Sequence, residues 1–102
     1  MCIFCKIISK EIPSSPIYEN DSYIVLNDLH PKSPIHMLII PKKHIETITD
    51  LEDNDEELIW WMFLLARDIA KDKNISWYKL QFNVWKDWWQ EIFHIHLHFL
   101  AN

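Results

Sequence analysis

The spacing of apolar residues changes along the chain from short runs to a helical period and back. From 53 to 73 apolar residues recur every three or four positions, which predicts one long helix with Asp53 as its cap and Glu56 completing a capping box. Short apolar runs bounded by turn-forming residues predict strands elsewhere. The expected elements are a short helix at 3–9 and strands at 17–19, 23–27, 36–40, 78–84 and 94–100. They predict a single α+β domain, residues 1–102, with an antiparallel sheet of about five strands.

The predicted strand at 94–100 places three histidines on one face. Side chains alternate along a strand, so His94, His96 and His98 share one side and the apolar residues between them share the other. Neighbouring histidines would lie roughly 6.6 to 7 Å apart and the outer pair about 13 Å apart. One metal ion is therefore not expected to bind all three, and we expect separate roles. The alternative is an exposed polar face without chemistry.

Composition and charge restrict the class of protein and its partners. The chain has 102 residues, 49% hydrophobic and 25% charged, as is typical of a globular domain. A net charge of -5 argues against a nucleic-acid polymer as a partner but is compatible with a single bound nucleotide. No apolar run approaches the ~20 residues of a membrane span, and no signal-peptide core follows the first residues. We therefore expect a cytoplasmic protein without a membrane partner.

Cys2 and Cys5 form a C-x-x-C pair. In a reducing compartment this spacing indicates a metal site or a redox pair more than a structural disulfide. A thioredoxin-like redox motif normally opens a helix after a strand, whereas this pair begins the chain. The remaining alternative is a reduced pair of small apolar side chains.

The histidine run fits the H-x-H-x-H-x-x signature, and the chain resembles the histidine-triad (HIT) proteins, which are nucleotide-binding hydrolases and transferases. Further segments resemble the nucleoside phosphoramidase branch of that family: Cys2–Ile8, Lys10–Pro13, Asn27–Asp28, Pro34–His36 and Ile40–His44. The resemblance implies a HIT-like fold with one long helix, a short N-terminal helix and a homodimer formed through the long helix and the penultimate strand.

The resemblance also implies a division of roles among the histidines. His96 would attack phosphorus and form a nucleotidyl intermediate, with its other ring nitrogen oriented by a backbone carbonyl. A histidine with a pKa of ~6.5 is largely neutral at cytosolic pH, as a nucleophile must be. His98 would contact the α-phosphate and assist the leaving group. His36 and His94 would complete the cluster.

Other positions match the family's nucleotide and metal sites. Asp28 matches the carboxylate that receives the ribose hydroxyls, and Asn83 and Gln90 match positions near the phosphate. The apolar slot for the base is matched by Phe4, Ile7, Ile12 and Leu26. A structural zinc site is matched by Cys2, Cys5, His44 and His94. Taken alone, Asp28 is also a good turn residue, the two amides are ordinary polar residues and the apolar four are core residues. His30 matches no role and is expected to be solvated.

The tryptophans are the main departure from the family. Glycine is absent and tryptophan occurs six times, whereas average usage gives about seven glycines in such a chain. The tryptophans at family glycine positions are Trp60, Trp77, Trp85, Trp88 and Trp89, and Trp61 lies beside one of them. Either the glycines were replaced, or a codon that means glycine was read as tryptophan; confinement to glycine sites favours the misreading. The chain also ends soon after the triad, which suggests a missing C-terminal tail.

The expected activity is cleavage of the phosphorus–nitrogen bond of adenosine or other purine nucleoside phosphoramidates. The alternative is a zinc-stabilised nucleotide-binding or scaffolding protein with little or no catalysis, because indoles at 85, 88 and 89 would crowd the phosphate site. A further alternative is a sequence that does not populate the fold.

Overall fold

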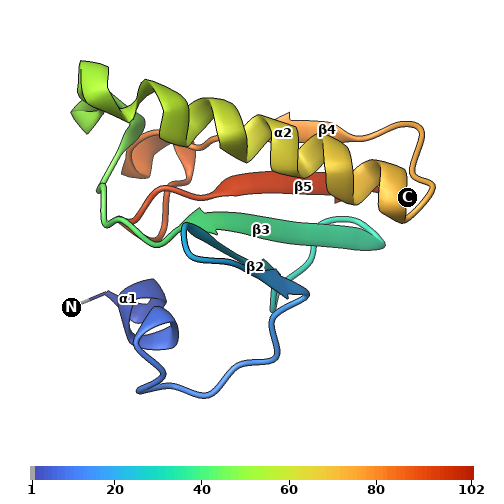
Figure 1. Ribbon diagram of the computed structural model, residues 1–102, viewed down its shortest axis with the longest axis horizontal. Helices are drawn as coiled ribbons and strands as arrows, with labels where there is room; N and C mark the ends of the chain where they lie inside the picture. Colours follow the sequence, from blue (N-terminus) through green and yellow to red (C-terminus); the bar gives the residue numbers. More distant parts are fainter. Residues whose placement is uncertain (1) are drawn as a thin grey trace.

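The structure is a computed structural model that describes residues 2–102. Its helices are α1 (Ile3–Ile8) and α2 (Glu56–Asp72), and its strands are β1 (Tyr18–Glu19), β2 (Tyr23–Asn27), β3 (Ile35–Pro41), β4 (Lys79–Gln81) and β5 (Leu97–Ala101). All neighbouring strands are antiparallel, in the order β1-β2-β3-β5-β4. Figure 1 shows β2, β3, β5 and β4 in this order. The predicted α+β architecture, with five antiparallel strands, one long helix and a short N-terminal helix, is confirmed.

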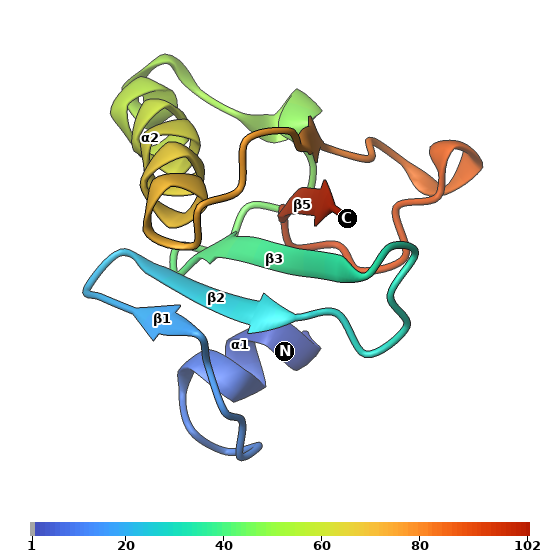
Figure 2. The ribbon, with the colours of Figure 1, turned by 90° about the vertical axis from the view of Figure 1, so that its right-hand side faces the viewer.

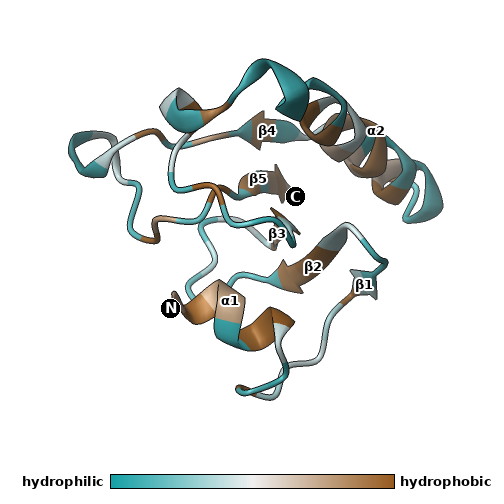
Figure 3. Cartoon of the chain, turned by 60° about the vertical axis from the view of Figure 1, so that its left-hand side comes forward, coloured by the Kyte–Doolittle hydropathy of each residue, from teal (hydrophilic) through white to brown (hydrophobic). Residues whose placement is uncertain are grey.

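The two helices cover opposite faces of the sheet (Figure 2). Alternation along the strands gives each helix its own apolar cluster, and apolar segments run through both helices and the central strands (Figure 3). The cluster beneath α2 includes Val25, Met37, Ile39, Met62, Ala66, Ile69, Leu97 and Phe99. The cluster beneath α1 consists of Phe4, Ile24, Leu26, Leu38 and Ile40. The catalytic candidates on β3 and β5 therefore lie on the α1 face.

The start of the long helix differs from the prediction. Residues Asp53–Asp55 form a 3-10 turn, and α2 begins at Glu56. The buried Asp55 carboxylate accepts a hydrogen bond from the Glu52 amide at 2.9 Å and pairs with Lys43. The predicted capping box of Asp53 and Glu56 is therefore wrong, because Asp55 closes the preceding turn instead.

Two predicted strands are shorter than expected. The strand predicted at 78–84 is restricted to Lys79–Gln81, and β5 begins only at Leu97. The histidine segment before Leu97 leaves the ladder because it pairs with the chain after β3: the Ile95 amide donates to the Ile45 carbonyl at 2.8 Å. His94 and His96 thus stand before the strand and not on it.

None of the helices among residues 2–102 combines the length and the apolar character needed to cross a membrane.

Candidate active site and metal centre

The β3–β5 register brings two histidines together. Leu38 pairs with His98, and His36 pairs with Leu100, so both histidine side chains are on the same face of adjacent strands. Their rings meet with His36 Nε2 and His98 Nδ1 2.9 Å apart. Antiparallel pairing therefore joins residues that lie 62 positions apart in the sequence.

The orientation of His96 is fixed by its neighbour's backbone. Nδ1 of His96 lies 2.8 Å from the carbonyl oxygen of His94. Because a carbonyl can only accept, Nδ1 carries the hydrogen and Nε2 keeps its lone pair in the neutral ring. Burial lowers the pKa of His96, and only 8% of the residue is exposed, so the neutral form is favoured. The rings of Phe4 and His96 pack edge to face at a centroid distance of 5.2 Å. His96 thus has the protonation state of a nitrogen nucleophile.

A second chain of hydrogen bonds sets the tautomer of His98. The Lys32 amide donates to His36 Nδ1 at 3.0 Å, so the neutral His36 ring carries its hydrogen on Nε2. That hydrogen is directed at His98 Nδ1, with Asp28 Oδ2 3.3 Å away as a second acceptor. His98 consequently carries its own hydrogen on Nε2. Burial, together with neighbouring His96 and His36, lowers the pKa of His98 to about 4, which keeps this ring neutral.

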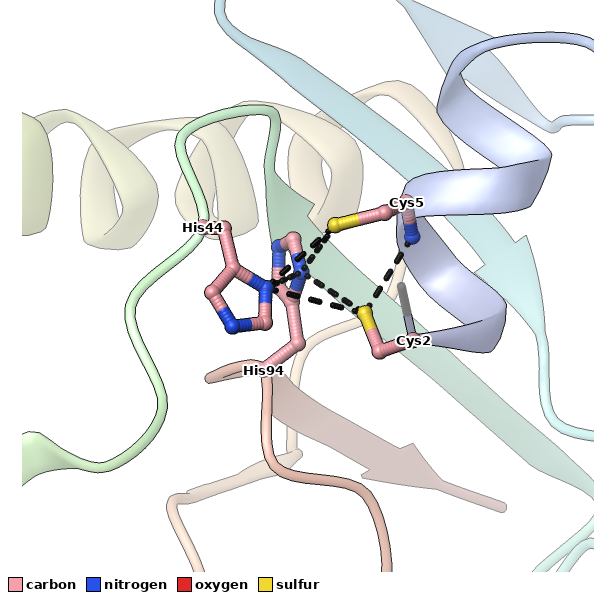
Figure 4. Close-up of side chains that lie close together, drawn as sticks. All are labelled: Cys2, Cys5, His44 and His94. Atoms are coloured by element: carbon pink, nitrogen blue, oxygen red, sulfur yellow. Dashed lines mark hydrogen bonds between the residues drawn. The ribbon is translucent and has the colours of Figure 1, made fainter.

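Two cysteines and two histidines converge between α1 and the segment after β3 (Figure 4). One ligand atom from each of Cys2, Cys5, His44 and His94 lies within 4.8 Å of all the others. The sulfur-to-Nδ1 distances range from 3.3 to 3.6 Å, and the two Nδ1 atoms are 3.1 Å apart. A tetrahedral zinc with ordinary bond lengths has edges of about 3.5 Å between sulfur and nitrogen and about 3.3 Å between nitrogens. The four donors therefore fit zinc in both chemistry and spacing.

The protonation of His94 agrees with this fit. Nε2 of His94 lies 2.7 Å from the Pro41 carbonyl and must donate to it, which leaves the lone pair of Nδ1 directed at the cysteines. The residue is fully buried, and burial lowers its pKa. A neutral ring with a free Nδ1 is the form that binds a metal ion.

The candidates for nucleotide binding are brought together only in part. Phe4 and Leu26 are buried in the α1 cluster, and Ile7 packs against it. Ile12 is half-buried and is not among the cluster residues that the structure describes. Asp28 lies beside the histidines, where Oδ1 accepts from the His30 amide at 2.9 Å. Phe4 of the apolar group contacts His96, and the Asp28 carboxylate lies 3.3 Å from Nε2 of His36.

The side chains of Asn83 and Gln90 form hydrogen bonds with backbone in and around the loop before the triad. Asn83 donates to the Trp88 carbonyl at 3.0 Å. Gln90 is buried, and its carboxamide bonds to the backbone of Trp85, Glu46 and Ile92. Both side chains shape the loop in this structure.

The same loop contains two tryptophans in backbone conformations suited to glycine. Trp85 has φ 76° and ψ 158°, and Trp89 has φ 67° and ψ 26°. The first lies in a region that is essentially restricted to glycine, and the second is left-handed. Trp88 and Trp89 are 69% and 71% exposed and pack edge to face on each other. The backbone thus agrees with the glycine positions implied by the resemblance.

Sequence reasoning missed the groups that orient the histidines. The Lys32 amide and the Pro41 carbonyl are backbone atoms, so residue type gives no signal for them. The prolines at 31 and 34 do predict a rigid loop before His36, and this loop contains the Lys32 amide.

Comparisons with known proteins extend over the whole chain. A family model described as scavenger mRNA decapping enzyme C-term binding matches residues 1–102. Protein HitA of Neisseria gonorrhoeae is 36% identical over 101 residues, covering 98% of this chain and 94% of that protein. The crystal structure of a HIT family hydrolase from Legionella pneumophila Philadelphia 1 has a TM-score of 0.96 and 42% identity, covering 100% of this chain and 93% of that one. A histidine triad protein from Clostridium difficile has a TM-score of 0.93 and 38% identity, covering 99% and 90%.

Proposed function

Since this chain belongs to the histidine-triad (HIT) family and shares its fold, we propose that it is a hydrolase of the nucleoside phosphoramidase branch. Its substrates would be adenosine or related purine nucleoside phosphoramidates, whose phosphorus–nitrogen bond it cleaves. One observation carries the proposal: a buried His96 with a free Nε2 stands beside His98, whose Nε2 carries a hydrogen. A nucleophile and a hydrogen-bond donor for the leaving amine are thereby adjacent.

The proposed reaction has two displacements at phosphorus. The lone pair of His96 Nε2 attacks the α-phosphorus, and the electron pair of the breaking P–N bond goes to the leaving nitrogen. That nitrogen accepts a hydrogen bond from the Nε2–H of His98, takes a proton from solvent and departs as a neutral amine, so the His98 ring stays neutral throughout. Water then attacks phosphorus, the P–Nε2 bond breaks back onto His96, and the spare proton of water returns to solvent. The products are AMP, for an adenosine substrate, and the amine.

Hydrolysis of a fluorogenic AMP phosphoramidate tests this proposal. His96→Ala should reduce turnover by several orders of magnitude because no other group replaces the nucleophile. His30→Ala is the matched control, since His30 lies in the exposed loop after Asp28. Unchanged turnover in the His96 variant would rule out the proposed intermediate.

We further propose that Cys2, Cys5, His44 and His94 hold a structural zinc ion. The donor spacing and the tautomer of His94 support this assignment. When bound, the ion would join the start of the chain to the segment that carries the triad, which favours folding.

A cytoplasmic homodimer is the proposed assembly. Strand β4 is an edge strand, and the aromatic side chains exposed on or near β4 and α2 are Trp60, Trp61, Phe63, Trp77 and Tyr78. An edge strand beside exposed aromatic residues is suited to an interface between identical copies. Sedimentation velocity decides the point: a monomer at micromolar concentration would contradict it.

The strained tryptophan loop favours a second candidate function, nucleotide binding or scaffolding with little catalysis. Trp85 and Trp89 have positive φ, and they lie in the loop whose Trp88 carbonyl accepts a hydrogen bond from Asn83. Binding of AMP by calorimetry without turnover of the fluorogenic substrate would select this candidate over the hydrolase.

A further inference from the structure

Gln90 is a buried amide whose side chain connects three separate stretches of backbone. Its Oε1 accepts from the Trp85 amide at 2.8 Å, and its Nε2 donates to the Glu46 carbonyl at 2.6 Å and to the Ile92 carbonyl at 3.1 Å. Only 2% of the residue is exposed. Both amide hydrogens are therefore engaged with carbonyl groups in a site that excludes water.

The three stretches are those that carry the histidines or lead to them. Glu46 follows His44 by two residues, and Ile92 precedes His94 by two. The two segments are also joined by the bond from the Ile95 amide to the Ile45 carbonyl, 2.8 Å long. The carbonyl of His94 in turn orients His96. A displacement of residues 92–94 would therefore rotate the carbonyl that aims the nucleophile.

We propose that Gln90 is a positioning residue of the reaction proposed above, on which this inference rests: its carboxamide fixes the backbone of residues 92–96 and thereby the aim of His96. A phosphate contact through Nε2 would require the loss of one of two buried hydrogen bonds. The cost of leaving a buried carbonyl without a partner opposes that exchange.

Two variants test the role of Gln90. Gln90→Met keeps the length of the side chain and removes all three hydrogen bonds. Gln90→Glu keeps the acceptor for the Trp85 amide but places a carboxylate oxygen against two carbonyls. For both we expect kcat to fall by about 10- to 100-fold while KM and the Kd for AMP stay within about twofold, because misplacement affects the attack and not ground-state binding.

A second measurement does not depend on turnover. Hydrogen exchange at the Ile95 amide should accelerate by about tenfold or more in both variants, since the segment opens more easily. Glu57→Met is the control: Glu57 is an exposed residue in the first turn of α2, and its replacement should leave this exchange rate unchanged.

The outcomes separate this inference from the proposed function. A rise in KM and in the Kd for AMP with unchanged kcat would identify a direct phosphate contact and overturn the positioning role. Unchanged exchange at Ile95 in both variants would also overturn it. If the wild-type protein shows no turnover, the proposed hydrolase fails, whereas faster exchange with an unchanged Kd for AMP would still support Gln90 as the residue that fixes this segment.

Discussion

The carbonyl oxygen of His94 accepts the Nδ1 hydrogen of His96 at 2.8 Å, while the side chain of His94 faces two cysteines. One residue therefore belongs to the candidate metal centre through its ring and to the candidate active site through its backbone. The two sites share a residue, and a single hydrogen bond connects the candidate metal ligand His94 to His96.

Loss of a metal ligand should lower both zinc content and stability. Purified wild-type protein should contain one zinc per chain, and Cys5→Ser should lose it. Without the ion we expect Tm to fall by about 10 °C, equivalent to about 2 kcal/mol for a domain of this size. Elemental analysis and a calorimetric melt provide the two readings. A variant that loses zinc and keeps its Tm would argue against a structural role.

The hydrogen bonds that connect the Lys32 amide, His36 and His98 give a prediction for His36. His36→Phe keeps a ring of similar size but removes both nitrogens. The ring can then neither accept the hydrogen bond from the Lys32 amide nor donate one to His98. We expect kcat for the fluorogenic substrate to fall by about 10- to 100-fold. His30→Phe, the same substitution in the exposed loop, should leave kcat unchanged. Equal effects of both variants would show that the His36 bonds do not matter for turnover.

Glycine should be tolerated better than tryptophan at two positions of the loop before the triad. Trp85→Gly and Trp89→Gly remove the cost of positive φ, which exceeds the added entropy of glycine in the unfolded chain. Each should raise the free energy of unfolding by about 1 kcal/mol in urea titrations.

Trp60→Gly is the opposing control, because Trp60 lies inside α2 and is 60% exposed. Because glycine is a poorer helix former than tryptophan, this substitution should lower the free energy of unfolding by about 0.5 kcal/mol. If all three substitutions destabilised the fold equally, the backbone strain inferred at 85 and 89 would be absent.

The lowered histidine pKa values predict a loss of stability in mild acid. The pKa of His98 is about 4 in the folded protein, against an ordinary value of ~6.5 in the unfolded chain. Between these values the unfolded state binds a proton that the folded state does not, so the free energy of unfolding rises with pH in this range. The groups that face His98 are His36, His96 and Asp28.

Chemical denaturation at several pH values measures this slope. Stability should fall as pH decreases from about 6.5 to about 4, and His98→Gln should reduce the slope. A flat profile over this interval would mean that His98 is protonated in the folded protein.

Much of the fold follows from local patterns in the sequence. The period of the apolar residues around Met62 and Ala66 predicts α2, and turn residues such as Asn20 separate the strands. The resemblance named the residues that the structure brings together at the metal centre. These features depend on residue types and spacing, which a sequence records directly.

The rest depends on contacts between distant segments. β5 starts at Leu97 because Ile95 pairs with Ile45, and no local pattern near His94 reports that partner. Gln90 has the residue type of a surface polar group, yet it is buried because three backbone groups surround it. The backbone atoms that orient the histidine rings cannot be identified from residue types.

The position of β5 in the sheet has a consequence for synthesis of the protein. β5 follows every other strand along the chain, but it pairs between β3 and β4. Translation proceeds at about 5 to 20 residues per second. The interval between synthesis of Pro41, the last residue of β3, and Leu97, the first of β5, is therefore roughly 3 to 11 s. During this interval the β5-facing edge of β3 has no strand partner, and unpaired edges are where chaperones or other chains bind in general.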